Sequence, residues 1–349
     1  MKAIVVTEPG GPEVLKAEDR PDPEPGPGQV VVRLAAANVN PTDVGARQGL
    51  FPPGFGIEGP PYVLGWDLAG TVVSVGEGVS DGPAAGTAGA TSPLGQDDED
   101  LATGPADGEP EPAALAADAD PGTPAFGPGD EVVGMIPWYA SGAQYGAYQE
   151  LVLLEARWLV RRPESLSAVD AATVPLNALT AEQCLGHLGA PEGAEVLVTG
   201  ASGAVGSFAV QLAVAQGLRV VAQAGTDDEE WVRDLGAARV LSRDEDLASA
   251  GSFTWVLDLV PLGKAVFPAV ADGGTIVTTR PIEAEPGRQV VQRPMLIEED
   301  TANLVRLVEG VATGGLRTRV SRTLPLEDAA EAHRTVEEPG RRGKIVLVP

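Results

Sequence analysis

Residues 195–225 carry the feature that most constrains the fold of this 349-residue chain, a glycine-rich turn between two apolar runs. The run "EVLVT" ends at Thr199, and glycines follow at the spacing G-x-x-G-x-x-G before a segment with apolar residues at helical spacing. A strand, a glycine turn and a helix let backbone amides approach a pyrophosphate at the positive end of the helix. The segment therefore predicts a dinucleotide site, and a purely structural turn is the alternative. The predicted cofactor contacts are Gly200, Ser202, Gly203, Ala204, Val205 and Gly206.

The end of the second apolar run, "LRVVAQA", bears on which dinucleotide is bound. An Asp or Glu at this place binds the ribose hydroxyls of NAD, but here Gln223 and Ala224 stand there. The following "DDEE" is typical of a helix cap, which gives Asp227 and Asp228 a structural role. Thr226 and Arg243 are the nearest groups able to hold a 2′-phosphate. The pattern favours NADPH and leaves NADH as the alternative.

Charge and residue usage exclude several kinds of partner. A net charge of −26 opposes nucleic-acid binding, which depends on clustered basic residues. No apolar run is long enough to span a membrane, and the start "MKAIVVTEPGGPE" is too briefly apolar for a signal peptide, so we expect a cytoplasmic protein without a membrane partner. A single cysteine, Cys184, and two histidines leave few ligands for zinc, so we expect no metal site.

Changes of pattern divide the chain into segments. Residues 81–125 contain ten acidic residues and no Val, Ile, Lys, Arg or aromatic residue, so we expect a mobile surface loop there. Short apolar runs bounded by Gly and Pro flank this segment and predict a β-rich domain. From about residue 166 to 288, strand and helix patterns alternate, which predicts a parallel sheet covered by helices. The fold class is therefore α/β with two domains.

The order of several motifs resembles a known family. The segments "ANVNPTD", "LGWDLAGTVVSVG", "AATVPLNALTA", "VLVTGASGAVG" and "GKIVL" together resemble the medium-chain dehydrogenase/reductase superfamily, in its zinc-free quinone oxidoreductase branch. The resemblance covers nearly the whole chain outside the acidic segment. It implies a GroES-like catalytic domain built from residues 1–165 and 289–349, a Rossmann doubly wound domain over residues 166–288, and a homodimer.

The resemblance also implies roles for individual residues. In zinc-dependent members a ligand histidine occupies the place of Trp66, and an indole cannot ligate zinc. Asn40 is implied as the residue that polarises or orients the acceptor and contacts the cofactor. Asp67 is implied as a hydrogen-bonding group beneath the substrate site, with acid/base catalysis as the alternative. The further implied cofactor contacts are Thr180, Val260 and Lys344.

Without a metal, the acceptor of a hydride must already be activated, as in a quinone or a C=C bond conjugated to a carbonyl. We therefore predict an NADPH-dependent reductase of a small quinone or α,β-unsaturated carbonyl compound. The alternatives are an NADPH-binding protein with little turnover and a structural or regulatory role, and a biosynthetic tailoring enoyl reductase. Gly45 and Phe51 occupy positions where the family often has tyrosines, so no proton donor is predicted there. Trp138, Tyr139 and Tyr145 are candidates for the wall of the acceptor site, with ordinary packing as the alternative.

Overall fold

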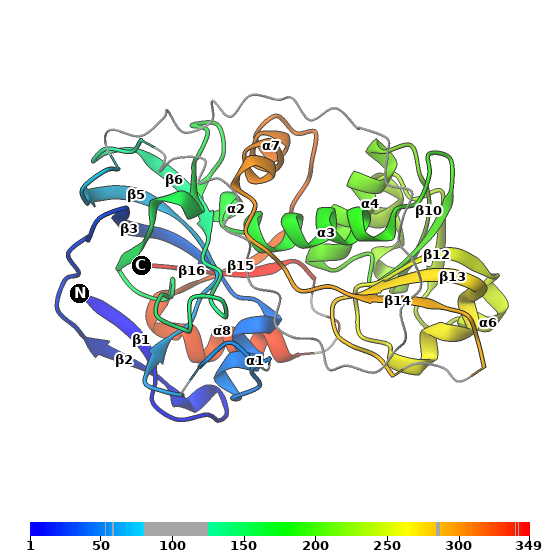
Figure 1. Ribbon diagram of the computed structural model, residues 1–349, viewed down its shortest axis with the longest axis horizontal. Helices are drawn as coiled ribbons and strands as arrows, with labels where there is room; N and C mark the ends of the chain where they lie inside the picture. The colour runs from blue at the N-terminus through cyan, green and yellow to red at the C-terminus, as the bar shows by residue number, and fades with distance from the viewer. Residues whose placement is uncertain (53, 58, 80–124, 284–286, 339, 341) are drawn as a thin grey trace, which may run out of the picture.

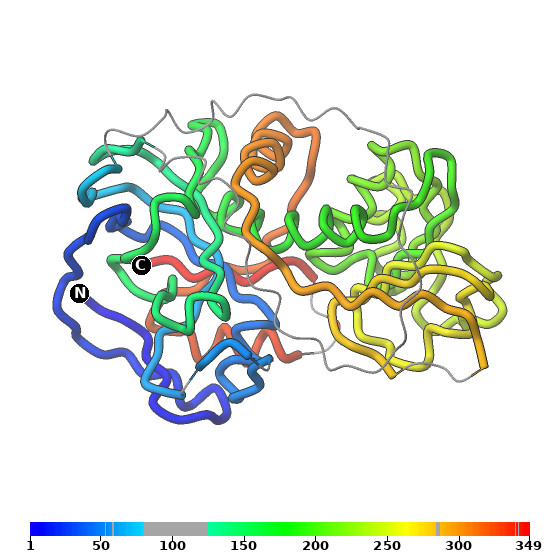
Figure 2. Tube along the Cα trace, in the orientation of Figure 1, coloured from blue at the N-terminus to red at the C-terminus, as the bar shows by residue number. Residues whose placement is uncertain are grey.

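The computed structural model describes residues 1–52, 54–57, 59–79, 125–283, 287–338, 340 and 342–349. The acidic segment 81–125 lies outside the described residues except for Ala125. The chain forms two lobes, with the long helix α3 (Pro175–Leu188) running from their junction into the second lobe (Figure 1). Both chain termini lie in the first lobe, where the N-terminal and C-terminal stretches run through the same fold (Figure 2). The α/β fold class with two domains is confirmed.

Two sheets form the first lobe, which we call the catalytic domain. The larger sheet has the order β15-β16-β3-β5-β6-β8, and β7 also pairs with β3. Its strands are β3 (Gln29–Asn38), β5 (Asp67–Val75), β6 (Glu131–Met135), β7 (Leu151–Glu155), β8 (Leu159–Arg161), β15 (Val320–Pro325) and β16 (Lys344–Val348). The smaller sheet contains β1 (Lys2–Val6), β2 (Leu15–Asp19) and β4 (Tyr62–Val63). The helices α1 (Pro41–Arg47) and α8 (Ala329–Glu337) complete this domain.

A six-stranded sheet forms the second lobe, the Rossmann domain, and all its strands are parallel. The order is β11-β10-β9-β12-β13-β14. The strands are β9 (Glu195–Thr199), β10 (Arg219–Ala224), β11 (Arg239–Ser242), β12 (Phe253–Asp258), β13 (Val270–Thr278) and β14 (Val291–Pro294). Because β10 and β12 lie on opposite sides of β9, the order reverses beside the strand that enters the glycine turn, where such sheets bind ligands. The sheet runs past residue 288, the boundary predicted from sequence, because β14 pairs with β13.

Short helices complete the described chain. The α-helices not yet named are α2 (Ala168–Ala171), α4 (Ala204–Ala215), α5 (Glu229–Asp234), α6 (Leu247–Ala250) and α7 (Thr301–Ala312). The 3₁₀ helices are η1 (Pro12–Val14), η2 (Ala156–Trp158), η3 (Thr226–Asp228), η4 (Gly263–Ala269) and η5 (Leu326–Asp328). None of the helices in this part of the chain combines the length and apolar character that crossing a membrane requires.

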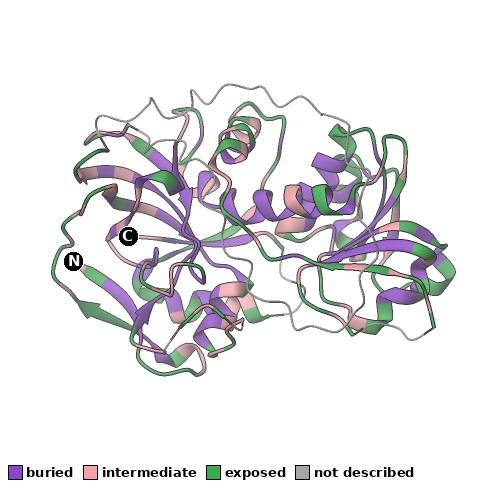
Figure 3. Ribbon diagram, in the orientation of Figure 1, coloured by how far each residue is buried: buried purple, intermediate pink, exposed green. Residues whose placement is uncertain are grey.

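The core follows the two sheets. Val196, Leu197 and Val198 of β9 are completely buried, as a strand covered on both faces by helices requires. Buried segments run through the middle of both sheets and along α3 and α4 (Figure 3). The helical pattern predicted for residues 167–188 forms two helices, α2 and α3, and Pro175 begins the second. Pro suits the first turn of a helix because it has no N–H to donate.

Candidate active site

The glycine turn between β9 and α4 has the form predicted from sequence. Gly200 has a φ of 63°, a left-handed conformation that glycine adopts without strain. A Cβ atom on Gly200 would lie 3.0 Å from the Cβ atom of Val260, so Val260 packs against the turn from the end of β12. A Cβ atom on Gly206 would lie 2.1 Å from the carbonyl oxygen of Gly200. The first and third glycines therefore build the turn itself, and Gly203 begins α4 in an extended conformation, with φ −72° and ψ 172°.

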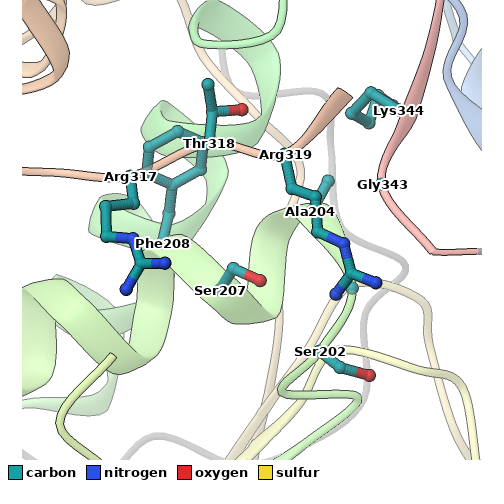
Figure 4. Close-up of a pocket in the computed structure, with 10 residues that line it drawn as sticks. Ser202, Ala204, Ser207, Phe208, Arg317, Thr318, Arg319, Gly343 and Lys344 are labelled. Atoms are coloured by element: carbon teal, nitrogen blue, oxygen red, sulfur yellow. The ribbon is translucent and has the colours of Figure 1, made fainter. Parts of the chain in front are cut away.

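A cavity opens beside this turn, where the two domains meet (Figure 4). Its Rossmann-domain wall consists of Ser202, Gly203, Ala204, Ser207 and Phe208, and its catalytic-domain wall consists of Arg317, Thr318, Arg319, Gly343 and Lys344. No side chain caps the N-terminus of α4, so its first amides are available to an anion. Two arginines and a lysine add positive charge opposite that helix end. These residues fit the pyrophosphate of a dinucleotide.

A buried polar cluster lies next to the cavity and joins three of the predicted site residues. The pairing of β3 with β5 sets Asn38 opposite Asp67. Asp67 Oδ2 accepts hydrogen bonds from Asn38 Nδ2 at 2.9 Å and from Asn40 Nδ2 at 2.8 Å. Asn40 Oδ1 in turn accepts one from Lys344 Nζ at 2.7 Å. Asn40, Asp67 and Lys344 therefore form one connected network, and Lys344 is also part of the cavity wall.

Asp67 connects the two domains. It has no exposed surface, and its Oδ1 accepts a hydrogen bond from the backbone N–H of Leu176 at 2.8 Å, in the first turn of α3. Burial raises the pKa of Asp67 above its ordinary value, and the hydrogen bonds from Asn38, Asn40 and Leu176 act in the opposite direction. The carboxyl group thus fixes the start of α3 and orients Asn40, which accords with a hydrogen-bonding role beneath the site.

A second buried carboxyl group, that of Asp43, lies beside this network. Its oxygens accept hydrogen bonds from the backbone N–H of Asn40 at 2.8 Å and of Gly65 at 3.0 Å. Burial raises the pKa of Asp43 from 3.8 to about 7, and the neighbouring Asp67 adds to the shift. The two carboxyl groups and the Lys344 ammonium therefore share one desolvated site.

The raised pKa of Asp43 predicts a pH dependence of stability. The folded protein holds this proton more tightly than the unfolded chain, so the free energy of unfolding should fall as pH rises from about 4 to about 7. Chemical denaturation across this range checks the slope, and Asp43→Asn should make it shallower because the side chain no longer titrates. A slope unchanged by Asp43→Asn would contradict the assignment.

Aromatic side chains pack around Trp66, the residue at the ligand position of the zinc enzymes. The rings of Trp66 and Tyr139 lie 5.1 Å apart edge to face, and Trp138 lies 5.6 Å from Tyr139. Trp138 Nε1 donates to the carbonyl oxygen of Val63. Tyr145 instead packs on Trp158 and donates to Glu155. Tyr145 is therefore separate from the ring cluster in which Trp138 and Tyr139 were grouped with it by the sequence analysis.

The remaining predicted contacts lie around the Rossmann sheet. Thr180 is buried on α3, the helix that Asp67 holds at its start. Val205 lies in the first turn of α4. Thr226 follows β10 at the surface, and the Arg243 guanidinium lies 3.9 Å from the position that a Cβ atom on Gly225 would take. Thr226 and Arg243 are thus near the same strand end.

One prediction about this strand end is wrong. Asp227 and Asp228 were expected to cap a helix, but the side chain of Asp228 makes no cap hydrogen bond to α5. Instead, Arg319 and Arg342 of the catalytic domain form ion pairs with these carboxylates. Guanidinium groups form charge-assisted hydrogen bonds, which are stronger than those from neutral backbone amides.

Sequence reasoning missed Asn38 and Arg319. Asn38 and Asn40 occupy alternate positions at the end of β3, and this spacing placed both amides on one side of the chain. That alternation was a usable signal for Asn38. Nothing local signalled Arg319, because its partner Asp228 lies about ninety positions away in the sequence.

Comparisons with known proteins agree with this arrangement. The model of the alcohol dehydrogenase GroES-like domain matches residues 26–164, and that of zinc-binding dehydrogenases matches residues 235–347. A trans-enoyl reductase of Aspergillus terreus is 30% identical over 258 residues, which are 71% of this chain and 70% of that protein. The chain belongs to the medium-chain dehydrogenase/reductase superfamily. This confirms the predicted family.

Further relatives place the chain within that superfamily. A chloroplastic NADPH-dependent alkenal/one oxidoreductase of Arabidopsis thaliana is 27% identical and spans 100% of this chain and 80% of its own. A quinone oxidoreductase of Lama guanicoe is 28% identical, with 100% and 97% covered. The chain falls in the quinone oxidoreductase-like branch and is an NAD(P)H-dependent oxidoreductase of a small-molecule substrate.

Solved structures of relatives have the same fold. A mycobacterial protein complexed with NADPH has a TM-score of 0.75 at 27% identity, and both chains are covered completely. An NAD-dependent alcohol dehydrogenase has a TM-score of 0.76 at 30% identity, again with both chains covered completely. These neighbours support a nicotinamide cofactor in the medium-chain fold, and they include both cofactor types.

Proposed function

We propose that this protein is a zinc-independent reductase that uses NADPH to reduce a quinone or an α,β-unsaturated carbonyl compound. The observation that carries the proposal is the network of Asn40, Asp67 and Lys344 beside the dinucleotide cavity. It occupies the region where zinc-dependent relatives bind their metal, and Trp66 stands at the ligand position. Among the residues described, no group of three His, Cys, Asp or Glu side chains is arranged to hold a metal ion.

The residues of the network divide the work of binding and orientation. Asp67 accepts from Asn40 and so fixes the amide, and Asn40 Oδ1 holds the Lys344 ammonium at the cavity wall. We assign Lys344, the glycine turn and Arg319 to cofactor binding and Asn40 to orientation. The ring cluster around Trp66 supplies an apolar surface suited to a conjugated acceptor. The bound nicotinamide would supply the hydride, and an acceptor activated by its own conjugation needs no metal.

The end of β10 supports NADPH rather than NADH. Gln223 is buried and Ala224 is apolar, so neither supplies the carboxylate that binds the ribose hydroxyls of NAD. Thr226 and Arg243 lie at the surface next to this strand end, where a 2′-phosphate would reach them. Support from relatives is direct for two of them, whose names or titles mention NADPH.

Steady-state oxidation of NADPH with a panel of acceptors tests the proposed function. The panel should contain quinones, enones and enoyl thioesters, with aldehydes and ketones lacking conjugation as controls. We expect turnover with conjugated acceptors and little with the controls. Tight NADPH binding without turnover on any acceptor would instead favour a binding role.

We predict that turnover does not depend on zinc. Trp66 at the ligand position and the scarcity of His and Cys leave no ligand set for it. Elemental analysis of the purified protein should find zinc well below one equivalent, and a strong chelator should leave turnover unchanged. Stoichiometric zinc whose removal abolishes turnover would contradict the prediction.

We also propose a homodimer. The strand β14 is an edge of the six-stranded sheet, and Val291 on it and Leu296 just beyond it are 46% and 50% exposed. An edge strand with exposed apolar side chains is suited to pairing with a second copy. Sedimentation analysis should find a dimer, and Val291→Lys should weaken it.

A further inference from the structure

We propose that Arg319 and Arg342, which reach across from the catalytic domain, bind the 2′-phosphate of NADPH by exchanging their present carboxylate partners for it. This inference rests on the NADPH preference proposed above, and it names a recognition element outside the Rossmann domain. The juxtaposition that carries it is two arginines of one domain held against two aspartates of the other, at the edge of the dinucleotide cavity.

The position of the aspartates fixes the part of the cofactor concerned. β10 ends at Ala224, and Asp227 and Asp228 follow in η3. In dinucleotide-binding folds, the end of the second strand faces the adenosine ribose. Asp228 has a side chain that is only 11% exposed, whereas Asp227 is 81% exposed. The two carboxylates are therefore placed where a ribose or its phosphate would lie.

Both carboxylates already have cationic partners. Arg319 Nη1 lies 3.1 Å from Asp228 Oδ1, and Arg342 Nε lies 3.3 Å from the same oxygen. Arg342 Nη2 also lies 2.5 Å from Asp227 Oδ2. A carboxylate that recognises NAD accepts hydrogen bonds from ribose hydroxyls, but here that acceptor capacity is turned toward guanidinium groups. The acidic pair therefore does not act against a phosphate, because the arginines compensate its charge.

Arg319 is also held at the cavity. It lines the cavity together with Ser202 and Gly203, and Figure 4 shows its guanidinium on the side of the Rossmann-domain turn. The guanidinium carbon lies 5.4 Å from the centre of the Trp231 ring, on which Arg317 also stacks at 4.4 Å. A ring contact restricts the orientation of the planar guanidinium group, and this favours bidentate recognition of a phosphate.

The exchange follows from charge. A phosphate monoester carries nearly two negative charges at neutral pH and offers three acceptor oxygens, whereas each aspartate carries one charge. Two arginines therefore bind the phosphate more strongly than they bind the partly exposed carboxylates. Because the arginines belong to the catalytic domain, a phosphate bound at the end of β10 would also join the two domains. NADH would lack this contact.

Binding measurements on four ligands test the proposal. Dissociation constants of NADPH, NADH, 2′,5′-ADP and 5′-AMP are measured by calorimetry for the wild type, Arg319→Ala and Arg342→Ala. We expect each variant to lose roughly 10- to 100-fold in affinity for NADPH and 2′,5′-ADP. Binding of NADH and 5′-AMP should change less than about 2-fold, the range expected when no contact is lost. Arg322→Ala is the matched control, since Arg322 is exposed on the same strand as the approach to Arg319.

Equal weakening of NADPH and NADH would overturn the proposal and assign the arginines to the pyrophosphate or to domain packing. Unchanged NADPH binding in both variants would overturn it as well. If the wild type binds NADPH no more tightly than NADH, the proposed cofactor preference fails together with this inference. If the wild type prefers NADPH and the variants retain that preference, only this inference fails.

Asp228→Asn provides a second test that keeps both arginines. Removing the competing negative charge should tighten NADPH and 2′,5′-ADP binding several-fold and leave NADH unchanged. Weaker NADH binding with unchanged NADPH binding would assign Asp228 to the ribose hydroxyls and overturn the exchange. Circular dichroism of each variant verifies that the protein is folded.

Discussion

Replacing Gly203 by valine should abolish dinucleotide binding while the protein remains folded. Gly203 is extended, a conformation that valine adopts readily, and a Cβ atom there would meet only the carbonyl oxygen of Gly200, at 3.1 Å. The added side chain would instead stand over the amides at the start of α4, in the cavity wall. We expect the NADPH dissociation constant to rise by at least about 100-fold, because backbone approach to the pyrophosphate is lost.

Two other glycines provide contrasts for this result. Gly186→Ala on α3 has no atom within 4 Å of the added Cβ, so it should leave both binding and stability unchanged or slightly improved. Gly206→Val should fail to fold, because its Cβ would lie 2.1 Å from Gly200 O and 2.8 Å from Ala201 Cα. Calorimetry and circular dichroism separate these outcomes. Unimpaired NADPH binding by folded Gly203→Val would refute the placement of the pyrophosphate.

Replacing Asp67 by alanine should cause the largest loss of stability among the buried polar residues considered. Its carboxyl group accepts hydrogen bonds from Asn38, Asn40 and the Leu176 amide, and all three donors are in the buried network. Alanine would leave these donors unpaired and would remove a negative group near the buried Lys344. Breaking a buried charged network in this way costs about 3–5 kcal/mol. Urea denaturation of the variant measures the loss.

Asp67→Asn is the conservative control for this prediction. An asparagine keeps the shape and one acceptor oxygen, so we expect a smaller loss of about 1–3 kcal/mol. Both variants should also weaken NADPH binding, because Asn40 and Lys344 lose their fixed positions. A loss below about 0.5 kcal/mol for Asp67→Ala, the size of an ordinary surface substitution, would show that the network is not a structural unit.

Local patterns in the sequence carried much of the fold. The turn at Gly200, Gly203 and Gly206 could be predicted because its determinants lie within a few residues: a buried strand, a left-handed glycine and a helix with an apolar face. The resemblance to the family then supplied what local pattern could not, namely that both ends of the chain form one domain. The boundary at residue 288 falls short of β14 because this strand reads as weakly apolar, with exposed Val291 and Arg293.

The assembly of the site depends on pairing between distant strands. Asn38 meets Asp67 through the register of β3 and β5, and Val346 pairs with Asn38 through β16, which carries Lys344 to the cluster. The separate residues could be selected from the sequence, but the sequence does not give the register that joins them. The same limit explains the error at Asp228, whose partners lie in another domain. A local capping pattern was visible, and the distant arginines that compete for it were not.

Transfer of deuterium from C4-deuterated NADPH tests the central claim most directly. The wild-type protein is treated with a strong chelator, incubated with the labelled cofactor and a conjugated enone, and the product is examined by mass spectrometry and NMR. The account predicts one deuterium at the carbon β to the carbonyl, at an undiminished rate without metal. A product labelled only after zinc is restored, or deuterium found at the carbonyl carbon of an alcohol product, would contradict it.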